Sequence, residues 1–218
     1  MIEAMVFDMD GLLFDTERIV QRSWNRAGEV LGYGPMGEQI YHTLGFNVVR
    51  REQYFKKLYG QDFPMEKFSP LTRKFFYEIA DAEGISMKPG VRELLIYAKA
   101  HGIKTALATS SREAHARSLL EEQGIWKYFD GAVYGDMVEH AKPNPEIYQK
   151  ACAMIGVNPS KSIALEDAPA GIRAAHAAGM LPVMIPDLVQ PDSEIRTLCW
   201  KQFGSLMDVL GILELREI

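Results

Sequence analysis

The sequence contains little cysteine and no long apolar run. Only Cys152 and Cys199 occur, which is too few for a disulfide framework, and their spacing is not that of a zinc site. We therefore expect a protein of the reducing cytoplasm. No stretch approaches the roughly 18 apolar residues of a membrane-spanning helix, and the first residues lack the basic and then apolar pattern of a secretory signal. These absences argue against secretion and against membrane insertion.

The chain also lacks an excess of positive charge. Its formal net charge is -5 and its pI is near 5.6. Non-specific binding to nucleic acid or to an anionic membrane needs a basic face, so we expect neither partner. Fixed-period repeats and low-complexity tracts are absent as well, while 47% hydrophobic residues are enough for a buried core. We expect a folded monomer in which an anionic ligand would need a local positive site.

An apolar run near the N-terminus ends abruptly in two carboxylates. Residues 4–7 are typical of a buried strand, and Asp8 and Asp10 follow directly, before Gly11. The alternation of a strand sends both carboxylates the same way. Two such charges repel by roughly 4 kcal/mol at about 4 Å and the effective dielectric of a protein surface, so a cation is expected nearby. A simple solvated turn is the alternative, because Asp and Gly are common in turns.

The hydrophobic pattern beyond this motif changes twice. Residues 17–31, 36–44, 48–59 and 65–82 are helix-like and are separated by glycine-rich breaks, which predicts a small helical bundle. From residue 88 onward, helices alternate with predicted strands at residues 103–108, 131–134, 162–165 and 182–185. We therefore predict an α/β fold: a Rossmann-like, doubly wound parallel sheet core (residues 1–15 and 88–218) with an inserted α-helical bundle as a cap domain (residues 16–87).

Polar side chains follow the predicted strands where ligands of such sheets bind. In chain order they are Asp8 and Asp10, then Thr109, Ser110 and Ser111, then Lys142, and finally Glu166 and Asp167. Each group has a simpler explanation. The Thr and Ser residues could cap the next helix, Lys142 could be a surface lysine, and Glu166-Asp167 could precede a helix as an N-cap pair. Four carboxylates in one place, however, are hard to hold without a hard divalent cation.

Residues 8–17, Asp-Met-Asp-Gly-Leu-Leu-Phe-Asp-Thr-Glu, closely resemble the first motif of the haloacid dehalogenase-like superfamily. Thr109, Lys142 and Glu166-Asp167 match the other three motifs of the superfamily in order. The predicted cap lies at the same place in the chain as the cap of its phosphoglucomutase-like phosphatase branch, which the sequence resembles. The resemblance implies that Asp8 is a nucleophile forming an aspartyl-phosphate and that Asp10 is an acid/base. It implies that Thr109 and Lys142 hold phosphoryl oxygens. As ligands of Mg²⁺ we expect the Asp8 carboxylate, the Asp10 main-chain carbonyl and Asp167, with Glu166 behind them or as an occasional ligand.

These residues predict an enzyme, a Mg²⁺-dependent phosphatase of a small phosphorylated metabolite such as a sugar phosphate or a nucleoside-like monophosphate. We expect substrate contacts from the cap, which closes over the site, and from loop residues of the core. The predicted contacts are Ser110, Ser111, Arg112 and Arg50, the last of these beside the loop 45–47, while Phe14, Thr16 and Glu17 lie at the hinge.

Two other functions stay open at this point. A sugar-phosphate mutase would use the same intermediate, but mutases of this branch carry a histidine soon after the hinge Asp-Thr, where this chain has Arg18, Ile19 and Val20. A non-enzymatic binding protein on the same fold is the second alternative. Dehalogenation has no use for Asp10 as a proton donor or for a metal cluster.

Overall fold

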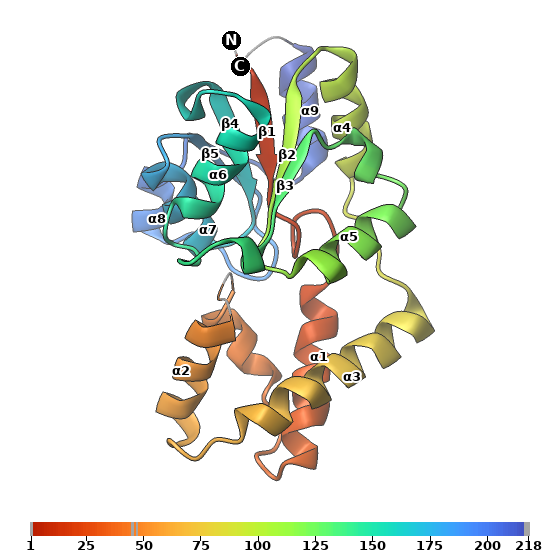
Figure 1. Cartoon of the computed structure of the whole chain (residues 1–218), viewed down its shortest axis with the longest axis vertical. Helices are drawn as coiled ribbons and strands as arrows, with labels where there is room; N and C mark the ends of the chain where they lie inside the picture. Colours follow the sequence, from red (N-terminus) through yellow and green to blue (C-terminus); the bar gives the residue numbers. More distant parts are fainter. Residues whose placement is uncertain (1, 45, 47, 216–218) are drawn as a thin grey trace.

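The computed structural model describes residues 2–44, 46 and 48–215. Its sheet contains six parallel strands in the order β3-β2-β1-β4-β5-β6. The strands are β1 (Ala4–Phe7), β2 (Lys104–Ala108), β3 (Gly131–Val133), β4 (Ser162–Glu166), β5 (Leu181–Met184) and β6 (Lys201–Gln202). The order reverses at β1, and the carboxyl ends of the strands all face the lower half of the molecule in Figure 1. The predicted doubly wound α/β core is confirmed.

Helices cover both faces of this sheet. Met5 and Phe7 of β1 pack into one core with α4 (Val91–Ala100), α5 (Glu113–Glu122) and α9 (Leu206–Glu214). Ala4 and Val6 pack on the opposite face with α6 (Glu146–Ile155) and α7 (Pro169–Ala177). Every residue of β1 is therefore buried, which explains why the strand is continuously apolar rather than alternating.

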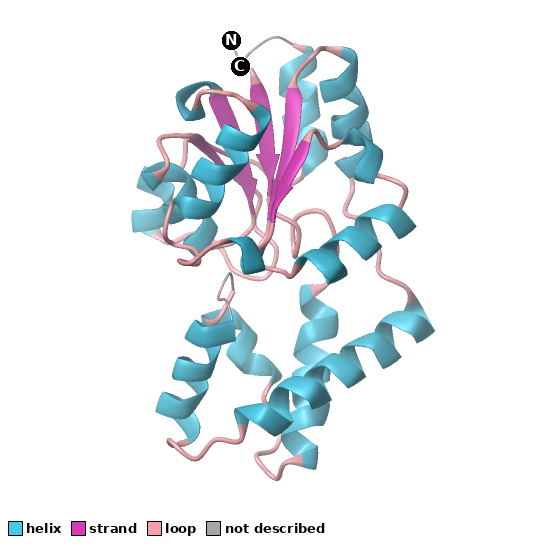
Figure 2. Cartoon of the chain, in the orientation of Figure 1, coloured by secondary structure: helices cyan, strands magenta, loops and turns pink. Residues whose placement is uncertain are grey.

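A helical unit lies beyond the carboxyl ends of the strands. It comprises α1 (Glu17–Val30), the 3₁₀ segment η1 (Gly37–His42), α2 (Val48–Tyr59) and α3 (Met65–Glu83). Figure 2 shows that the strands are confined to the other half of the molecule. An aromatic core with edge-to-face contacts holds the unit together; its members include Trp24, Phe55, Phe63 and Phe68. The inserted helical cap is confirmed, while its boundaries at residues 16 and 87 stay a prediction.

Two antiparallel segments join the cap to the core. Asp15 N–H donates to Ser86 O over 2.9 Å, and Lys88 N–H donates to Leu13 O over 2.9 Å. Phe14 and Met87 form the bridge between these two bonds. The exit from the core and the return to it are therefore hydrogen-bonded side by side, as a two-stranded hinge.

Two parts of the chain differ from the expectation or had none. Residues 36–44 were expected to be helical, but they form only η1, where Gly37 N–H is held by Asn25 Oδ1 at 2.6 Å. Short helical segments of this length, bonded at one end to a neighbouring helix, commonly adopt the tighter 3₁₀ form.

The sequence pattern predicted neither α8 (Ser193–Leu198), nor β6, nor α9. Short 3₁₀ segments also occur as η2 (Trp126–Tyr128), η3 (Gly135–Met137) and η4 (Pro159–Lys161). Within the described ranges, no helix has the length and apolarity needed to cross a membrane.

Candidate active site

Lys142 is the cation that meets the first aspartate. It is only 2% exposed, and its Nζ donates to Asp8 Oδ1 (2.5 Å), Glu166 Oε1 (2.6 Å) and Ala108 O (2.9 Å). These three bonds use all three donors of the ammonium group. Burial alone would lower the pKa of Lys142, but the charges of Asp8 and Glu166 raise it. The explanation of Lys142 as a solvated surface lysine is therefore wrong.

Three carboxylates gather beside this lysine. One ligand oxygen from each of Asp8, Glu166 and Asp167 lies within 4.8 Å of the others, and all three residues are buried. Burial raises the pKa of Asp8 to about 7, with added repulsion from Glu166 and Asp10 and an opposing effect of Lys142. Burial and repulsion from Asp8 also raise the pKa of Asp167 well above its usual range.

Asp167 carries the clearest evidence that a further cation belongs here. Its buried Oδ2 has no hydrogen-bond partner among the described residues. A Cβ on Gly11 would lie 2.3 Å from that same oxygen, so only a glycine permits this approach of the backbone. A buried charged oxygen without a partner is costly. The donor set, all oxygen and strongly negative, fits a hard divalent cation such as Mg²⁺.

Glu166 is occupied by protein partners. Its Oε1 accepts hydrogen bonds from Lys142 and from the buried Tyr148 hydroxyl (2.5 Å), and its Oε2 accepts a longer one from Ala168 N–H (3.4 Å). The N-cap residue of α7 is Ala168, which has no side-chain cap, so the idea of Glu166-Asp167 as an N-cap pair is wrong. Sequence reasoning missed Tyr148. Its place on the apolar face of α6 indicated burial but gave no sign of a polar partner.

Asp10 stands apart from the carboxylate cluster. Its Oδ1 accepts from Thr16 Oγ1 at 2.8 Å and its Oδ2 from Ser111 Oγ at 2.7 Å. Ser111 thus holds Asp10, and because it also lines the cavity described below, its predicted contact with the substrate stays a prediction. The two aspartates of the first motif thus have different surroundings: Asp8 faces a lysine, and Asp10 faces two hydroxyls.

Thr109 and Ser110 occupy the loop that follows β2. Thr109 is buried and its Oγ1 accepts from Ser111 N–H at 3.0 Å. The helix that follows begins at Glu113, whose N–H donates to Asp136 Oδ1 at 3.3 Å. Helix capping by Thr109 and Ser110 is therefore wrong as an explanation of these residues. They lie instead at the edge of the sheet that also carries Asp8.

A cavity of about 870 Å³ lies between the cap and this edge of the sheet. The core lines it with Asp8, Asp10, Lys142, Glu166 and Asp167, together with Ser110, Ser111 and Arg112, of which Arg112 is exposed. The cap lines it with residues from α1, α2 and α3, including Glu17 and Arg51, neither of which the sequence identified as a ligand contact. The structure therefore brings the predicted core residues together at one cleft, except for Thr109, which is buried and does not line the cavity.

Arg50 reaches the core in another way. Its Nη1 donates to Lys142 O at 3.3 Å, and its guanidinium lies 3.9 Å from the centre of the Phe46 ring. The predicted substrate contact is thus a contact between cap and core at the backbone of Lys142. Of the expected cap loop 45–47, Gly45 and Asn47 lie outside the described residues.

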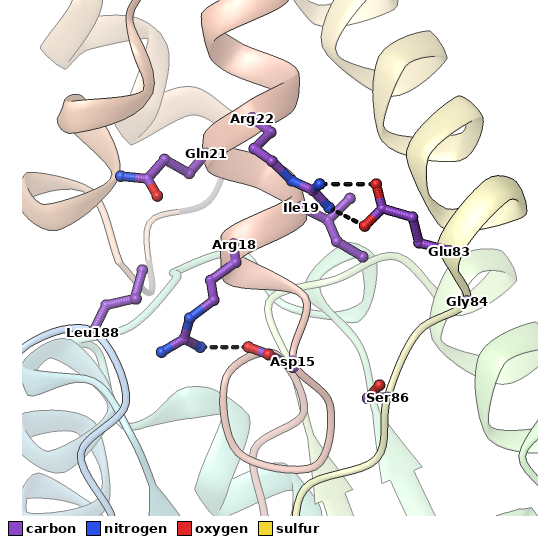
Figure 3. A pocket seen from close by; sticks show the side chains of 9 residues that line it. All are labelled: Asp15, Arg18, Ile19, Gln21, Arg22, Glu83, Gly84, Ser86 and Leu188. Atoms are coloured by element: carbon purple, nitrogen blue, oxygen red, sulfur yellow. Dashed lines mark hydrogen bonds and ion pairs between the residues drawn. The ribbon is translucent and has the colours of Figure 1, made fainter.

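A second cavity, of about 500 Å³, lies near the hinge and is shown in Figure 3. Its charged side chains pair with one another: Arg22 forms two 2.8 Å bonds with Glu83, and Arg18 contacts Asp15 at 2.5 Å. None of the predicted catalytic or metal residues lines it. The larger cavity is therefore the candidate active site.

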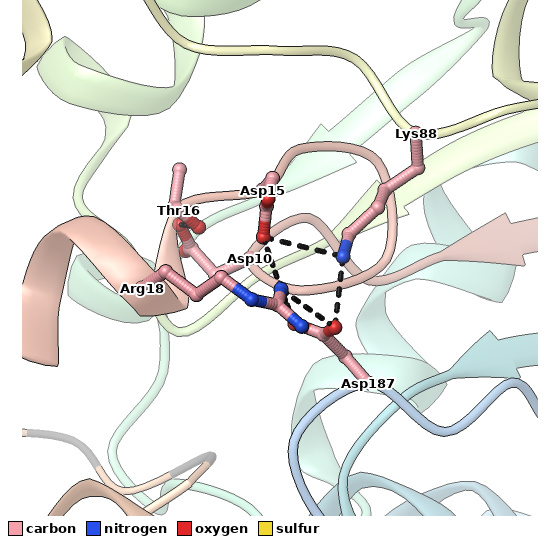
Figure 4. Close-up of polar contacts among 6 residues, drawn as sticks. All are labelled: Asp10, Asp15, Thr16, Arg18, Lys88 and Asp187. Carbon is pink, nitrogen blue, oxygen red and sulfur yellow. Dashed lines mark hydrogen bonds and ion pairs between the residues drawn. The ribbon is translucent and has the colours of Figure 1, made fainter.

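The hinge itself is held by four charged side chains (Figure 4). Asp187, from the loop after β5, accepts from Arg18 Nη1 at 3.0 Å and from Lys88 Nζ at 2.8 Å. Asp15 contacts the same two cations, at 2.5 and 3.3 Å. We call Asp15, Arg18, Lys88 and Asp187 the hinge cluster. It joins both connecting segments to the core.

Comparison with known proteins identifies the family of the chain. The family model of haloacid dehalogenase-like hydrolases matches residues 2–179. The chain belongs to this family. Both the predicted family and the prediction of a hydrolase are confirmed.

Three similar proteins illustrate the range of the family. A phosphorylated carbohydrates phosphatase of Thermotoga maritima is 35% identical over 182 residues, covering 82% of each chain. The crystal structure of CbbY from Rhodobacter sphaeroides in complex with phosphate has a TM-score of 0.82 at 28% identity, covering 96% of each chain. The β-phosphoglucomutase of Clostridium difficile has a TM-score of 0.82 at 24% identity, covering 98% of this chain and 96% of its own, and shows a shared fold.

Proposed function

We propose that the chain is a Mg²⁺-dependent phosphatase that hydrolyses a small phosphorylated carbohydrate through an aspartyl-phosphate on Asp8. The observation that carries this proposal is the separation of the two aspartates. Asp8 is bonded to Lys142 beside an Asp167 oxygen that has no partner among the described residues, whereas Asp10 is held by Thr16 and Ser111. One carboxylate is available as a nucleophile and the other as an acid and base.

The metal would be held by the Asp8 carboxylate, the Asp10 main-chain carbonyl and Asp167. When bound, Mg²⁺ would neutralise negative charge on the nucleophile and on the phosphoryl oxygens. Glu166 Oε1 already accepts hydrogen bonds from Lys142 and Tyr148, so we propose that Glu166 does not bind the metal directly. The buried Asp167 Oδ2, which has no hydrogen-bond partner in the described part of the chain, is the feature that supports the site most directly.

The side chains divide the reaction between them. Asp8 attacks phosphorus, and the bond from phosphorus to the ester oxygen breaks. We expect Thr109 to hold a phosphoryl oxygen. Lys142, whose three donors are bonded to Asp8, Glu166 and Ala108 O, would stabilise the phosphoryl charge from beside Asp8. Asp10 donates a proton to the departing oxygen and then takes one from the water that hydrolyses the aspartyl-phosphate, a contribution of about a hundredfold to ten-thousandfold. Its two hydroxyl partners keep it oriented for both proton transfers.

Phosphatase activity is favoured over mutase activity by the residues that follow the hinge. Arg18 is engaged in the hinge cluster, Ile19 is buried, and Val20 lines the cavity as an apolar side chain. None of them can act as the histidine of the mutases. The Thermotoga relative, named for phosphorylated carbohydrates, supports a sugar phosphate as substrate. We propose Ser110 and Arg112 as further substrate contacts from the core.

Phosphate release from a panel of phosphate esters, with Mg²⁺ or with EDTA, tests the proposal. We expect hydrolysis that requires Mg²⁺ and falls by at least about a thousandfold in Asp8→Asn, the scale seen when a catalytic nucleophile is removed. Asp62→Asn, an exposed aspartate of the cap, is the matched control. If wild type releases no phosphate from any ester, or if Asp8→Asn retains full activity, the enzyme mechanism is wrong.

A hexose 1-phosphate separates the two chemistries that share the intermediate. Free phosphate as the main product supports the phosphatase, and an isomeric hexose phosphate as the main product supports the mutase. A monomeric state and a cytoplasmic location stay predictions.

A further inference from the structure

The loop that follows β2 carries three groups on which the proposed reaction depends. Ser110, Ser111 and Arg112 of this loop line the main cavity, and Ser111 Oγ also donates to Asp10. A displacement of the loop would therefore disturb the proposed substrate contacts and the proposed acid and base together. The residues that hold its backbone matter for the reaction even where they touch no substrate.

The turn after β3 lies directly against this loop. The strands β2 and β3 lie side by side in Figure 1 and pair as far as Ala108 and Val133. Thr109 N–H continues the pattern by donating to Val133 O at 3.1 Å, and Gly135 N–H then donates to Ser111 O at 2.9 Å. Both bonds join one strand exit to the other, so the turn after β3 fixes the position of the loop.

Gly135 makes the closest backbone approach to the loop. A Cβ atom at this position would lie 2.2 Å from Ser110 O, 2.8 Å from Ser110 C and 3.3 Å from Ser110 Cα. All three atoms belong to the backbone, so rotation of a side chain cannot relieve the overlap. Gly135 begins η3 with a φ outside the left-handed region, so its own conformation does not demand glycine. Glycine is required here for space.

A side chain of the same turn holds the far end of the loop. Asp136 Oδ1 accepts from Glu113 N–H at 3.3 Å, at the start of α5. An acceptor at this place satisfies one of the N–H groups that a helix leaves free at its N-terminus, and it fixes where α5 begins. The bond is long and Asp136 is exposed, so its contribution is smaller than that of Gly135.

We propose that Gly135 and Asp136 are positioning residues, which hold the loop 109–112 at the place that phosphoryl transfer to Asp8 requires. Neither touches the reacting atoms, and both act through the backbone of the loop. A misplacement on the order of 1 Å can cost about a hundredfold in rate. A Cβ on Gly135 forces a displacement of this size, because real Cβ atoms approach other atoms no closer than 3.0 Å. This inference rests on the proposed function and adds the residues that set the geometry of its phosphoryl site.

Gly135→Ala adds one methyl group and tests the assignment directly. We expect kcat for the best ester of the panel to fall by about a hundredfold. The dissociation constant of inorganic phosphate, titrated calorimetrically with Mg²⁺ present, should rise by about tenfold, the scale of one hydrogen bond to a charged group. The dissociation constant of Mg²⁺ should keep its wild-type value, because the proposed metal ligands follow β1 and β4. A general loosening of the fold would weaken Mg²⁺ binding as well.

Two further variants complete the comparison. Gly211→Ala is the matched control, because a Cβ at this position of α9 meets no described atom within 4 Å apart from the backbone of its own helix. It should keep the wild-type kcat and both affinities. Asp136→Ala removes the bond to Glu113 N–H and should lower kcat and phosphate affinity by about threefold each, with Mg²⁺ affinity unchanged.

A combined variant shows whether Gly135→Ala acts through the loop. Ser111→Ala removes the hydroxyl that holds Asp10. If the loop is already displaced in Gly135→Ala, adding Ser111→Ala should lower kcat by a smaller factor than it does in wild type. The same factor in both backgrounds would show that the two changes are independent and would overturn the inference.

The remaining outcomes separate the inference from the proposed function. A folded Gly135→Ala protein with wild-type kcat and phosphate affinity would overturn the inference and leave the phosphatase intact, and so would an equal loss of Mg²⁺ affinity. If Gly135→Ala shows no cooperative thermal transition, Asp136→Ala decides in its place, and wild-type values for that variant overturn the inference. If wild type hydrolyses no ester, the proposed function is wrong, and the phosphate and Mg²⁺ titrations still decide the role of the turn.

Discussion

At the scale of single residues, Tyr148 has an unexpected function in the site. Its hydroxyl donates to Glu166 Oε1 at 2.5 Å, and its ring centre lies 5.1 Å from Lys142 Nζ. The tyrosine therefore bonds the same Glu166 oxygen as Lys142 does, and its ring covers the ammonium group. It positions two charged groups without needing to touch a substrate.

Tyr148→Phe keeps the ring and removes only the hydroxyl. We expect a loss of about 1 to 3 kcal/mol in the free energy of unfolding, because Glu166 loses a buried charged hydrogen bond. We also expect weaker Mg²⁺ binding, since a Glu166 that is less firmly held leaves Lys142 and Asp8 less well placed. Chemical denaturation and calorimetric titration with Mg²⁺ measure the two effects.

Tyr97→Phe is the matched control, because the Tyr97 hydroxyl donates to Leu213 O at 3.1 Å far from the carboxylates. It should cost stability but leave Mg²⁺ binding unchanged. A Tyr148→Phe protein that binds Mg²⁺ as wild type does would limit Tyr148 to a packing role.

The residues that sequence reasoning found and missed differ in one physical respect. Asp8, Asp10, Thr109 and Asp167 lie just after strands, and Lys142 lies in the longer segment between β3 and α6, so parallel topology brings them to one edge of the sheet. Tyr148, Glu17 and Arg51 lie on helices, where a side chain reaches the site only through the packing of that helix. Sequence periodicity predicts which face of a helix is buried, but not which buried hydroxyl or guanidinium finds a polar neighbour.

At the scale of secondary-structure elements, the same limit explains why the last strand of the chain was not predicted. The strands β1 to β5 are apolar runs bounded by turn residues and could be predicted. The strand β6 has two residues, Lys201 and Gln202, and is recognisable only through its pairing with β5. The helix α9 could have been predicted from Leu206, Val209, Leu210 and Leu213, which are all buried.

The hinge is the element whose electrostatics can be tested separately. Asp187 forms ion pairs with both cations of the hinge cluster, and its side chain is only 7% exposed. In Asp187→Asn, Asp15 would be the one carboxylate of the cluster left to pair with Arg18 and Lys88. We expect KM to rise by roughly fivefold, equivalent to about 1 kcal/mol, because cap closure then starts from a less ordered hinge.

The measurement is steady-state kinetics at low and high salt. High salt should weaken the wild-type hinge cluster, which is partly exposed, and should therefore reduce the difference between wild type and Asp187→Asn. Glu194→Gln removes the exposed ion pair with Arg173 away from the cap and should leave KM unchanged. An Asp187→Asn variant with wild-type KM at every salt concentration would show that the cluster does not control closure.

At the scale of the whole molecule, the carboxylate cluster opposes the stability of the fold. The pKa of Asp8 rises from 3.8 to about 7, and that of Asp167 also rises, mainly through burial. Between these two pH values the folded protein binds more protons than the unfolded chain, so these groups make stability fall as pH rises. Above about pH 7 the destabilising effect of Asp8 is complete, and a bound divalent cation would offset it.

Thermal melting of Asp167→Asn tests this balance between function and stability. Without metal at pH 8, the variant should melt higher than wild type, by roughly 4 to 8 °C if about 2 kcal/mol of repulsion and desolvation is removed. At pH 5 the difference should shrink, because the Asp8 carboxyl group, with a pKa of about 7, is then largely protonated in the folded protein and no longer repels Asp167. Saturating Mg²⁺ should raise the melting temperature of wild type more at pH 8 than at pH 5, and should have little effect on the variant.

Asp62→Asn, on the surface of the cap, is the control and should melt like wild type at pH 5 and at pH 8, with and without Mg²⁺. If Asp167→Asn instead melts lower than wild type without metal at pH 8, the aspartate stabilises the fold through its own contacts, and repulsion among the buried carboxylates does not limit stability.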